Sequence, residues 1–277
     1  MLNKILVSVI TISYNQENFI ENTIKSVLNQ GYPNIEYIVI DAGSSDRSRE
    51  IIMKYKKKIS KIIFEQDDGP ADGLNKGFKI AKGDILCWLN SDDILLDGSI
   101  EKVVKTFQNN KDIDVVYGNA WITDQYDNKV RKFHSDNFSV AMALYGASII
   151  SQQSTFIKKQ SYLKVAGFNK SNKISWDSEL FLDLGLNGSK FYKTDEFLSC
   201  LRMHDEGITG SGLNNEKLHD ETKKILSRVK KRKFNKLDNI IFYFFYFLRK
   251  LLNLNDTYER IKKGPVNKAN KKNNNIK

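Results

Sequence analysis

The first 120 residues alternate between short, almost continuously apolar runs and stretches whose apolar residues recur at helical spacing. The expected strands are residues 5–12, 35–40, 61–65, 84–89 and 115–118. Between them, residues such as Ile100, Val103 and Phe107 recur at i, i+3 and i+7. Strands that are apolar throughout are covered on both faces, and intervening amphipathic helices provide the crossovers between parallel strands. The pattern therefore predicts an α/β domain with a mostly parallel, Rossmann-like sheet and helices on both faces.

The remainder of the chain is less regular. We expect a polar loop at 124–129, helices near 137–145, 159–166 and 176–186, and strands near 154–157 and 190–193. A charged helical pattern covers 215–233, an aromatic and basic stretch follows at 239–254, and the chain ends in a Lys/Asn-rich segment. These features predict a main α/β domain at 1–210, a helical appendage at 211–262 and a disordered tail at 263–277.

Polar residues follow four of the expected strands, at the carboxyl ends where open α/β sheets bind ligands. They include Ser13, Tyr14 and Asn15 after the first strand and Asp41 after the second. Neither G-x-G-x-x-G nor G-x-x-x-x-G-K-[ST] is present, which argues against a dinucleotide fold or a P-loop. The polar strand ends therefore predict a site for another kind of ligand.

Acidic loops repel phosphates unless a divalent cation intervenes. Asp92 and Asp93, after the fourth strand, are oxygen donors that suit Mg²⁺ or Mn²⁺. Asp41 and Asp67 suit the ribose hydroxyls or base N–H groups of a nucleotide, because carboxylates accept hydrogen bonds. We therefore expect a metal-assisted site for a nucleoside diphosphate, with Asp72 and Asn75 beside it in the third loop.

Three segments in this order resemble the family 2 glycosyltransferases, which have a GT-A fold. They are residues 7–15 (VSVITISYN), 38–46 (IVIDAGSSD) and 84–93 (DILCWLNSDD), and the resemblance extends over about residues 5–205. It implies inverting transfer of a sugar from a nucleotide-diphosphate donor. The family's D-x-D motif reads Asn90-Ser91-Asp92 here, so Asp92 becomes the principal metal ligand and Asp93 a supporting one.

The resemblance also assigns residues in the second half of the chain. Asp177 matches the position of the general base, which takes the proton of the acceptor hydroxyl. Glu179 is an alternative base or a supporting group. His204, in an Arg-x-His sequence, matches a histidine that reaches the metal or the diphosphate.

Structural roles compete with several of these assignments. Asp92, Asp93 and Asp177 would also suit helix caps, and Asp72 would suit an exposed helix face. His204 would also suit a packed histidine. Asp41 would also suit a turn or an N-cap, and Tyr14 and Asn15 would equally serve in packing or in a turn.

The excess of basic residues that gives the net charge of +11 lies in the C-terminal part of the chain. Residues 217–277 contain 18 Lys+Arg and five Asp+Glu, whereas residues 1–216 are near neutral. Within that end, residues 240–248 are entirely apolar and would rise about 14 Å as a helix, half of a hydrocarbon core of about 30 Å. A basic, aromatic helix suits an anionic membrane surface; docking on the catalytic domain or an oligomer contact is the alternative.

These observations predict an enzyme at the inner face of the cell membrane. The apolar run at 5–12 lacks a signal-peptide cleavage site, and two lone cysteines suggest a reducing compartment, so we expect a cytoplasmic protein. It would add a sugar to a glycan or lipid-linked acceptor in cell-surface polysaccharide synthesis, using Mg²⁺ or Mn²⁺.

Two alternatives remain for the function. One is a catalytically degenerate transferase domain that serves as a membrane or assembly module. The other is a sugar nucleotidyltransferase, although the expected Gly-rich loop followed by Thr-Arg is missing. No nucleic-acid partner is expected, because the tail aromatics form one block without interleaved basic residues.

Overall fold

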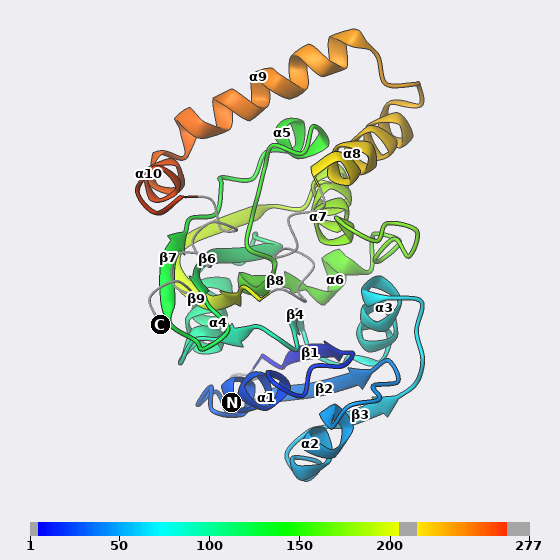
Figure 1. Cartoon of the computed structure of the whole chain (residues 1–277), viewed down its shortest axis with the longest axis vertical. Coiled ribbons are helices and arrows are strands. Elements are labelled where there is room, and N and C mark those ends of the chain that lie inside the picture. The colour runs from blue at the N-terminus through cyan, green and yellow to red at the C-terminus, as the bar shows by residue number, and fades with distance from the viewer. Residues whose placement is uncertain (1–4, 205–214, 265–277) are drawn as a thin grey trace.

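The computed structural model describes residues 5–204 and 215–264, and a curled sheet of nine strands forms the centre of this part of the chain (Figure 1). Neighbouring strands follow the order β3-β2-β1-β4-β8-β6-β9-β5, and β7 pairs with β6. The strands are β1 (Val7–Ser13), β2 (Ile35–Asp41), β3 (Lys61–Phe64), β4 (Ile85–Asn90), β5 (Ile94–Leu95), β6 (Val115–Thr123), β7 (Lys129–Phe133), β8 (Thr155–Lys158) and β9 (Phe191–Arg202).

Helices occupy most of the connections between these strands. They are α1 (Ile20–Leu28), α2 (Ser48–Lys54), α3 (Pro70–Ile80), α4 (Ser99–Asn109), α5 (Val140–Leu144), α6 (Lys159–Tyr162) and α7 (Trp176–Leu186), followed by α8 (Asn215–Lys230), α9 (Lys236–Leu252) and α10 (Leu254–Lys263). The fold is thus α/β, as the sequence predicts.

The first four long strands form a parallel unit with a change of winding direction. β3 pairs with β2, β2 with β1, and β1 with β4, all in parallel. Because β2 and β4 lie on opposite sides of β1, a topological switch point falls between β1 and β4. Ligands of open α/β sheets bind outside the carboxyl ends of the strands at such a point.

Two apolar clusters cover the two faces of the sheet, which confirms the predicted helices on both sides. Val7 and Val9 of β1 belong to one cluster, together with α1, α2 and α4. Ile10 belongs to the other, together with α3, α6 and α7. Gly77 lets the α3 backbone approach closely, because a Cβ there would lie 2.6 Å from Ile10 Cγ2. This close packing fixes the loop that precedes α3.

Two elements differ from the sequence-based expectation. β9 covers Phe191–Arg202 instead of 190–193, so the expected strand matches only its beginning, and the exposed, charged Asp195 and Glu196 interrupt the apolar pattern before the buried second half. Its pairing with β6 shifts register around Asn119, which further interrupts the pattern. β7 begins at Lys129, where the sequence suggests a polar loop, and forms an edge hairpin with β6.

The C-terminal helices pack beside the domain, with α8 against α5 and α10 against β7. The predicted domain boundary at 210 lies outside the described residues, as does most of the predicted tail. α10 itself continues to Lys263, the first residue of that predicted tail. None of the helices that the structure describes is long and apolar enough to cross a membrane.

Candidate active site

A cleft of about 590 Å³ opens at the carboxyl ends of the parallel strands, at the switch point between β1 and β4. Its wall comes from the ends of β1, β4 and β9, the loops after β2 and β3, and the start of α7. The lining residues are Ile12, Ser13, Tyr14, Gln16, Ala42, Gly43, Gln66, Asp67, Gly69, Pro70, Asn90, Ser91, Asp92, Asp93, Trp176, Leu201 and Arg202. A cleft therefore lies where the strand ends predict a ligand site.

Asp92 on the cleft wall contacts His204, and the two residues follow different strands, β4 and β9. Asp92 Oδ2 lies 3.0 Å from His204 Nε2, and the imidazole is buried against the ring of Phe19, with ring centroids 4.5 Å apart. Among the described residues, no three His, Cys, Asp or Glu side chains gather into a cluster that would hold a metal ion. The pair offers one carboxylate and one imidazole, a donor set that suits Mn²⁺ or Mg²⁺ when phosphate oxygens complete the coordination.

The side chain of Asp93 points into the protein and holds the loop after β4 in place beside the cleft. Its side chain is buried, with Oδ1 accepting from the Arg202 backbone N–H at 3.1 Å and Oδ2 accepting from the Gln152 amide at 3.4 Å. Burial and the neighbouring Asp92 raise the pKa of Asp93 well above its usual range. Its predicted role as a supporting metal ligand stays a prediction; the observed contacts join the loop after β4 to β9.

Arg202 connects the same two elements through its side chain. Its guanidinium donates to the backbone oxygen of Asp92 at 2.7 Å and pairs with Asp127 in the β6–β7 turn. It also lies over the Phe19 ring, 4.8 Å from the centroid. The sequence analysis gave Arg202 no separate role, although its place two residues before His204 in the Arg-x-His sequence was a usable signal.

Of the two carboxylates assigned to the nucleoside, Asp67 lies on the cleft wall and Asp41 does not. Asp67 accepts from the Gly69 backbone N–H at 2.9 Å, and burial raises its pKa. Asp41 is fully buried and accepts from the Ser44 backbone N–H and from Arg49 Nε. Nucleoside contact by either residue is still a prediction, but Asp41 is already engaged in holding its loop.

Asp72 and Asn75, on α3, contact the loop before α7. Asp72 pairs with Lys170, and this ion pair lowers the pKa of Asp72. The Asn75 amide donates to the Phe168 backbone oxygen at 2.8 Å and accepts from the Phe168 backbone N–H at 2.9 Å. Neither residue belongs to the cleft lining. Their donor-binding roles stay predictions, and the contacts they make position the loop that leads to Asp177.

Ser13, Tyr14 and Asn15 occupy different positions at the end of β1. Ser13 and Tyr14 line the cleft, and Tyr14 is 59% exposed. Asn15 has a positive φ of 50°, and its side-chain oxygen accepts from the Ser45 backbone N–H at 2.9 Å. Asn15 therefore ties the loop after β1 to the loop after β2, a turn role that the sequence analysis left open.

Asp177 is the second residue of α7, next to Trp176 in the cleft wall. Burial raises the pKa of Asp177, and its carboxylate accepts from the Ser178 backbone N–H at 2.7 Å. Glu179 is buried and accepts from the amides of Asn169 and Asn172. The contacts of Glu179 are those of a supporting group that holds the loop before α7, one of the two roles predicted for it.

Three buried oxygen atoms on the cleft wall have no hydrogen-bond partner in the described residues: Ser13 Oγ, Gln16 Oε1 and Asn90 Oδ1. Buried polar atoms normally find partners, so these three are candidates for hydrogen bonds to a polar ligand. The sequence analysis missed Gln16. Its place just after a polar strand end was the only available signal.

A polar cleft at the switch point of a mostly parallel sheet defines a ligand-binding α/β enzyme. The chain belongs to glycosyl transferase family 2, whose family model matches residues 8–173. The protein is thus a glycosyltransferase with a GT-A fold, as its resemblance to the family implied.

Individual relatives agree with this assignment. An uncharacterized glycosyltransferase of Rickettsia typhi is 30% identical over 217 residues, covering 76% of this chain and 67% of the relative. A putative teichuronic acid biosynthesis glycosyltransferase of Bacillus subtilis is 40% identical over 102 residues, covering 36% of this chain and 40% of the relative. The mannosyltransferase of Pyrobaculum calidifontis, solved with GDP-Man and Mn²⁺, shares the fold with a TM-score of 0.64 at 15% identity, covering 97% of this chain and 74% of that structure.

Proposed function

We propose that this glycosyltransferase moves a sugar from a nucleoside-diphosphate donor to an acceptor hydroxyl, with inversion. The observation that carries the proposal is the meeting of Asp92 and His204 at a cleft whose wall presents three unpartnered oxygen atoms. The donor would lie in that cleft, with its nucleoside toward Asp67 and its diphosphate toward Asp92. The solved relative with GDP-Man and Mn²⁺ supports this class of ligand.

Asp92 and His204 would hold a divalent cation, Mg²⁺ or Mn²⁺, together with diphosphate oxygens. Such a cation, when bound, supplies positive charge that stabilises the departing nucleoside diphosphate. The protein itself would keep the side chains of Asp92 and His204 next to each other. The contacts of Asp93 and Arg202 do this by fixing the loop after β4 on β9.

Asp177 would act as the general base that accepts the proton of the attacking hydroxyl. Its raised pKa suits a base, because a carboxylate of higher basicity takes a proton more readily. The loop that precedes it is held by Glu179 from one side and by Asn75 from the other. Displacement then occurs in one in-line step, with the acceptor oxygen replacing the diphosphate oxygen at the anomeric carbon.

The acceptor would be a glycan or a lipid-linked glycan in cell-surface polysaccharide synthesis, at the inner face of the cell membrane. The similarity to the teichuronic acid biosynthesis enzyme supports the polysaccharide part of this proposal. The basic, aromatic C-terminal helices support the membrane location. We also propose the division into a catalytic domain at 1–210 and a membrane-associating segment at 211–262.

Donor hydrolysis by the purified protein tests the proposed reaction. A panel of UDP-, GDP- and dTDP-sugars would be incubated with Mn²⁺ or with EDTA, and release of the free nucleotide would be measured. Metal-dependent release from one donor, lost in Asp92→Ala and in Asp177→Asn, is the expected result.

The alternative function is a degenerate transferase domain, and the replacement of the first D-x-D acid by Asn90 favours it. No turnover of any donor, together with no nucleotide binding by calorimetry, would establish that alternative and overturn the proposed reaction.

A further inference from the structure

On the α9 helix the two buried side chains are charged, whereas apolar side chains lie on both sides: Phe242 and Phe245 are half-buried beside His219 and Tyr145, and others are exposed to solvent. Asp238 is fully buried and Arg249 is 7% exposed. Ile240, Phe244 and Phe247 are each more than half exposed. An isolated surface helix of a globular domain normally buries its apolar stripe, so the exposed stripe on α9 needs a partner.

A buried polar cluster holds the N-terminal end of α9. Asp238 accepts from Arg232, from Tyr145 Oη on the catalytic domain at 3.0 Å, and from the backbone N–H of the N-cap residue Asn235. These donors, Arg232 first, lower the pKa of Asp238, which stays ionised. The polar side of the helix is therefore satisfied against the protein.

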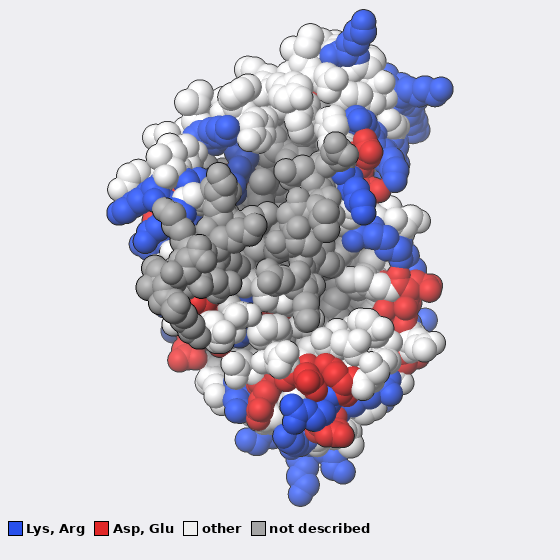
Figure 2. Space-filling view, in the orientation of Figure 1, with Lys and Arg blue, Asp and Glu red and all other residues white. Residues whose placement is uncertain are grey.

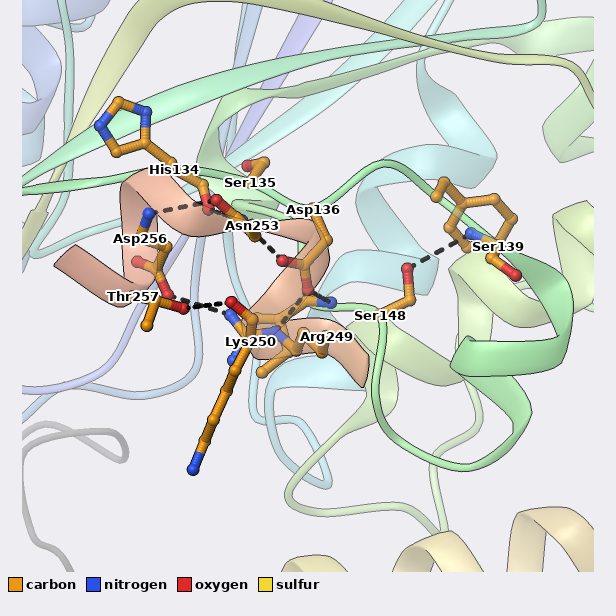
Figure 3. Close-up of polar contacts among 12 residues, drawn as sticks. His134, Ser135, Asp136, Ser139, Ser148, Arg249, Lys250, Asn253, Asp256 and Thr257 are labelled. Atoms are coloured by element: carbon orange, nitrogen blue, oxygen red, sulfur yellow. Dashed lines mark hydrogen bonds and ion pairs between the residues drawn. The ribbon is translucent and has the colours of Figure 1, made fainter. Parts of the chain in front are cut away.

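A second buried cluster holds the other end, where α9 turns into α10 (Figure 3). Arg249 lies between two buried carboxylates, with Nε 2.6 Å from Asp136 and Nη2 3.1 Å from Asp256. Asn253 also donates to Asp136, at 2.7 Å. Because Asp136 belongs to the catalytic domain, the two clusters fix which side of α9 faces outward.

The outward side carries a continuous set of exposed apolar residues, which we call the α9 apolar face. On α9 they recur at helical spacing, and others continue around the turn into α10. The members are Ile240, Tyr243, Phe244, Phe247, Leu251, Leu252, Leu254, Tyr258 and Ile261. In Figure 1, α9 lies along the side of the molecule farthest from β3.

Exposed charges around this face are basic at both ends. Lys231, Lys233 and Lys236 precede or begin α9, whereas Lys262 and Lys263 end α10. Two of the three acidic residues between 231 and 263 are the buried Asp238 and Asp256. Figure 2 shows a largely uncharged surface over α9, with Lys and Arg groups toward its two ends.

We propose that the α9 apolar face docks on the surface of an anionic lipid bilayer, with α9 lying in the plane of the interface. Apolar and aromatic side chains would enter the boundary of the acyl chains, while the lysines at both ends contact anionic headgroups. This inference rests on the proposed membrane location and specifies the surface that makes it. The two buried clusters would hold the catalytic cleft in a fixed orientation to the bilayer.

The charge distribution favours a bilayer over a second copy of the chain. Both ends of the face are basic, so a symmetric pairing of two copies would bring lysines against lysines in either helix direction. An anionic bilayer instead complements both ends at once. A dimer through this face is therefore an outcome that the experiment must distinguish.

Vesicle co-sedimentation of the full chain tests the proposal. The vesicles would be made of phosphatidylcholine with or without phosphatidylglycerol. Two variants would be compared with the unmodified protein: Phe244→Ser/Phe247→Ser and Lys231→Gln/Lys233→Gln/Lys236→Gln. The aromatic variant is expected to lower partitioning at least about 100-fold, because two large apolar side chains lose their transfer into the interface. The lysine variant is expected to lose the preference for phosphatidylglycerol.

Matched substitutions on the catalytic domain serve as controls. Leu163 is 68% exposed, as much as the members of the face, so Leu163→Ser is expected to bind vesicles like the unmodified protein. Lys56→Gln/Lys57→Gln/Lys58→Gln removes three exposed lysines elsewhere and is expected to keep the lipid preference. Thermal melting would show that each variant is folded.

Equal vesicle binding by the aromatic variant and by Leu163→Ser would overturn the proposal. So would a dimer in sedimentation velocity that Phe244→Ser/Phe247→Ser separates, without any vesicle binding. Hydrolysis of a soluble donor is expected to continue in every variant, because none of the substituted residues lines the cleft. Loss of the transfer reaction and loss of membrane docking are thus measured separately.

Discussion

The Asp92 carboxylate and the His204 imidazole lie 3.0 Å apart, although 112 positions separate the two residues in the sequence. The strand β9 makes this contact possible, because it pairs with β6 and carries His204 to the end of β4, just beyond Arg202. The side chain of His204 is buried, whereas that of Asp92 is 21% exposed. The carboxylate is therefore the member of the pair that a ligand in the cleft reaches first.

Replacing Asp92 tests this arrangement directly. We expect Asp92→Ala to lower kcat/KM for the donor by roughly 10³-fold, since stabilisation of a departing charge by a metal is worth several kcal/mol. His204→Ala is expected to raise the Mn²⁺ concentration needed for half-maximal activity. Steady-state kinetics across a Mn²⁺ titration measure both effects. Asp97→Ala, at an exposed carboxylate just beyond the same loop, is the control, and an equal loss in that variant would count against the assignment.

Replacing Ser13, whose hydroxyl has no partner among the described residues, is expected to weaken nucleotide binding without lowering the stability of the protein. Its Oγ is buried on the cleft wall and has no hydrogen-bond partner among the described residues, so Ser13→Ala removes no hydrogen bond that this part of the chain makes. If the donor supplies the missing partner, the variant is expected to bind UDP or GDP roughly 2- to 10-fold more weakly. Its melting temperature is expected to stay the same or to rise slightly. Calorimetric titration and thermal melting give the two values, and unchanged affinity would show that Ser13 does not contact the nucleotide.

The sequence predicts the first half of the fold well because the central strands β1, β2 and β4 are largely buried, and only the short β3 is a partly exposed edge strand. β1, β2, β3 and β4 each begin and end within two residues of the expected positions. The apolar runs of β1, β2 and β4 are typical of strands in the centre of a sheet. The cleft follows from the same pattern, because polar residues at four parallel strand ends must gather at one edge.

The second half is harder to predict because its long strand is only partly buried. Asp195 and Glu196, in the middle of β9, are exposed and charged and read as the end of a strand, although the backbone goes on pairing with β6 as far as Arg202. The roles of Asp41 and Asn75 depend on which atoms their side chains meet, and this information is absent from strand-end spacing. The orientation of α9 was likewise hidden, since residues 240–248 are apolar on every side and the buried contacts of Asp238 and Arg249 fix which side faces outward.

The buried Arg249 predicts a large loss of stability on truncation. Arg249→Ala would leave Asp136 and Asp256 as uncompensated charges in the interior, although the neighbouring Arg260 still pairs with Asp256. Breaking a buried ion pair in this way costs about 3–5 kcal/mol of unfolding free energy. Urea denaturation measures the difference. Lys250→Ala, at the exposed neighbouring position, is expected to change stability by less than about 0.5 kcal/mol.

Ionisation of Asp177 is expected to lower the stability of the folded protein and to raise its activity as pH increases. Burial raises its pKa above the usual value of 3.8, so the folded protein holds a proton that the unfolded chain has already lost. Stability therefore falls as pH rises from about the unfolded pKa through the raised folded pKa, because the unfolded state binds fewer protons in that window. Asp177→Asn removes this cost, so at pH 7 the variant is expected to be at least as stable as the unmodified protein.

Activity should respond in the opposite direction, because a general base must be ionised to accept the proton of the acceptor hydroxyl. We expect the rate of sugar transfer to fall as pH decreases through the raised pKa of Asp177, above the range of an ordinary carboxylate. Asp177→Asn is expected to lower kcat by roughly 10²- to 10⁴-fold, the usual contribution of such a group, and to abolish that acidic limb. Thermal melting and a pH–rate profile on the same variant measure the two signs. If Asp177→Asn lost stability and kept the pH profile of the unmodified protein, Asp177 would be a supporting residue and not the base. Asp195→Asn, at an exposed carboxylate, is the control and is expected to change neither stability nor the pH profile.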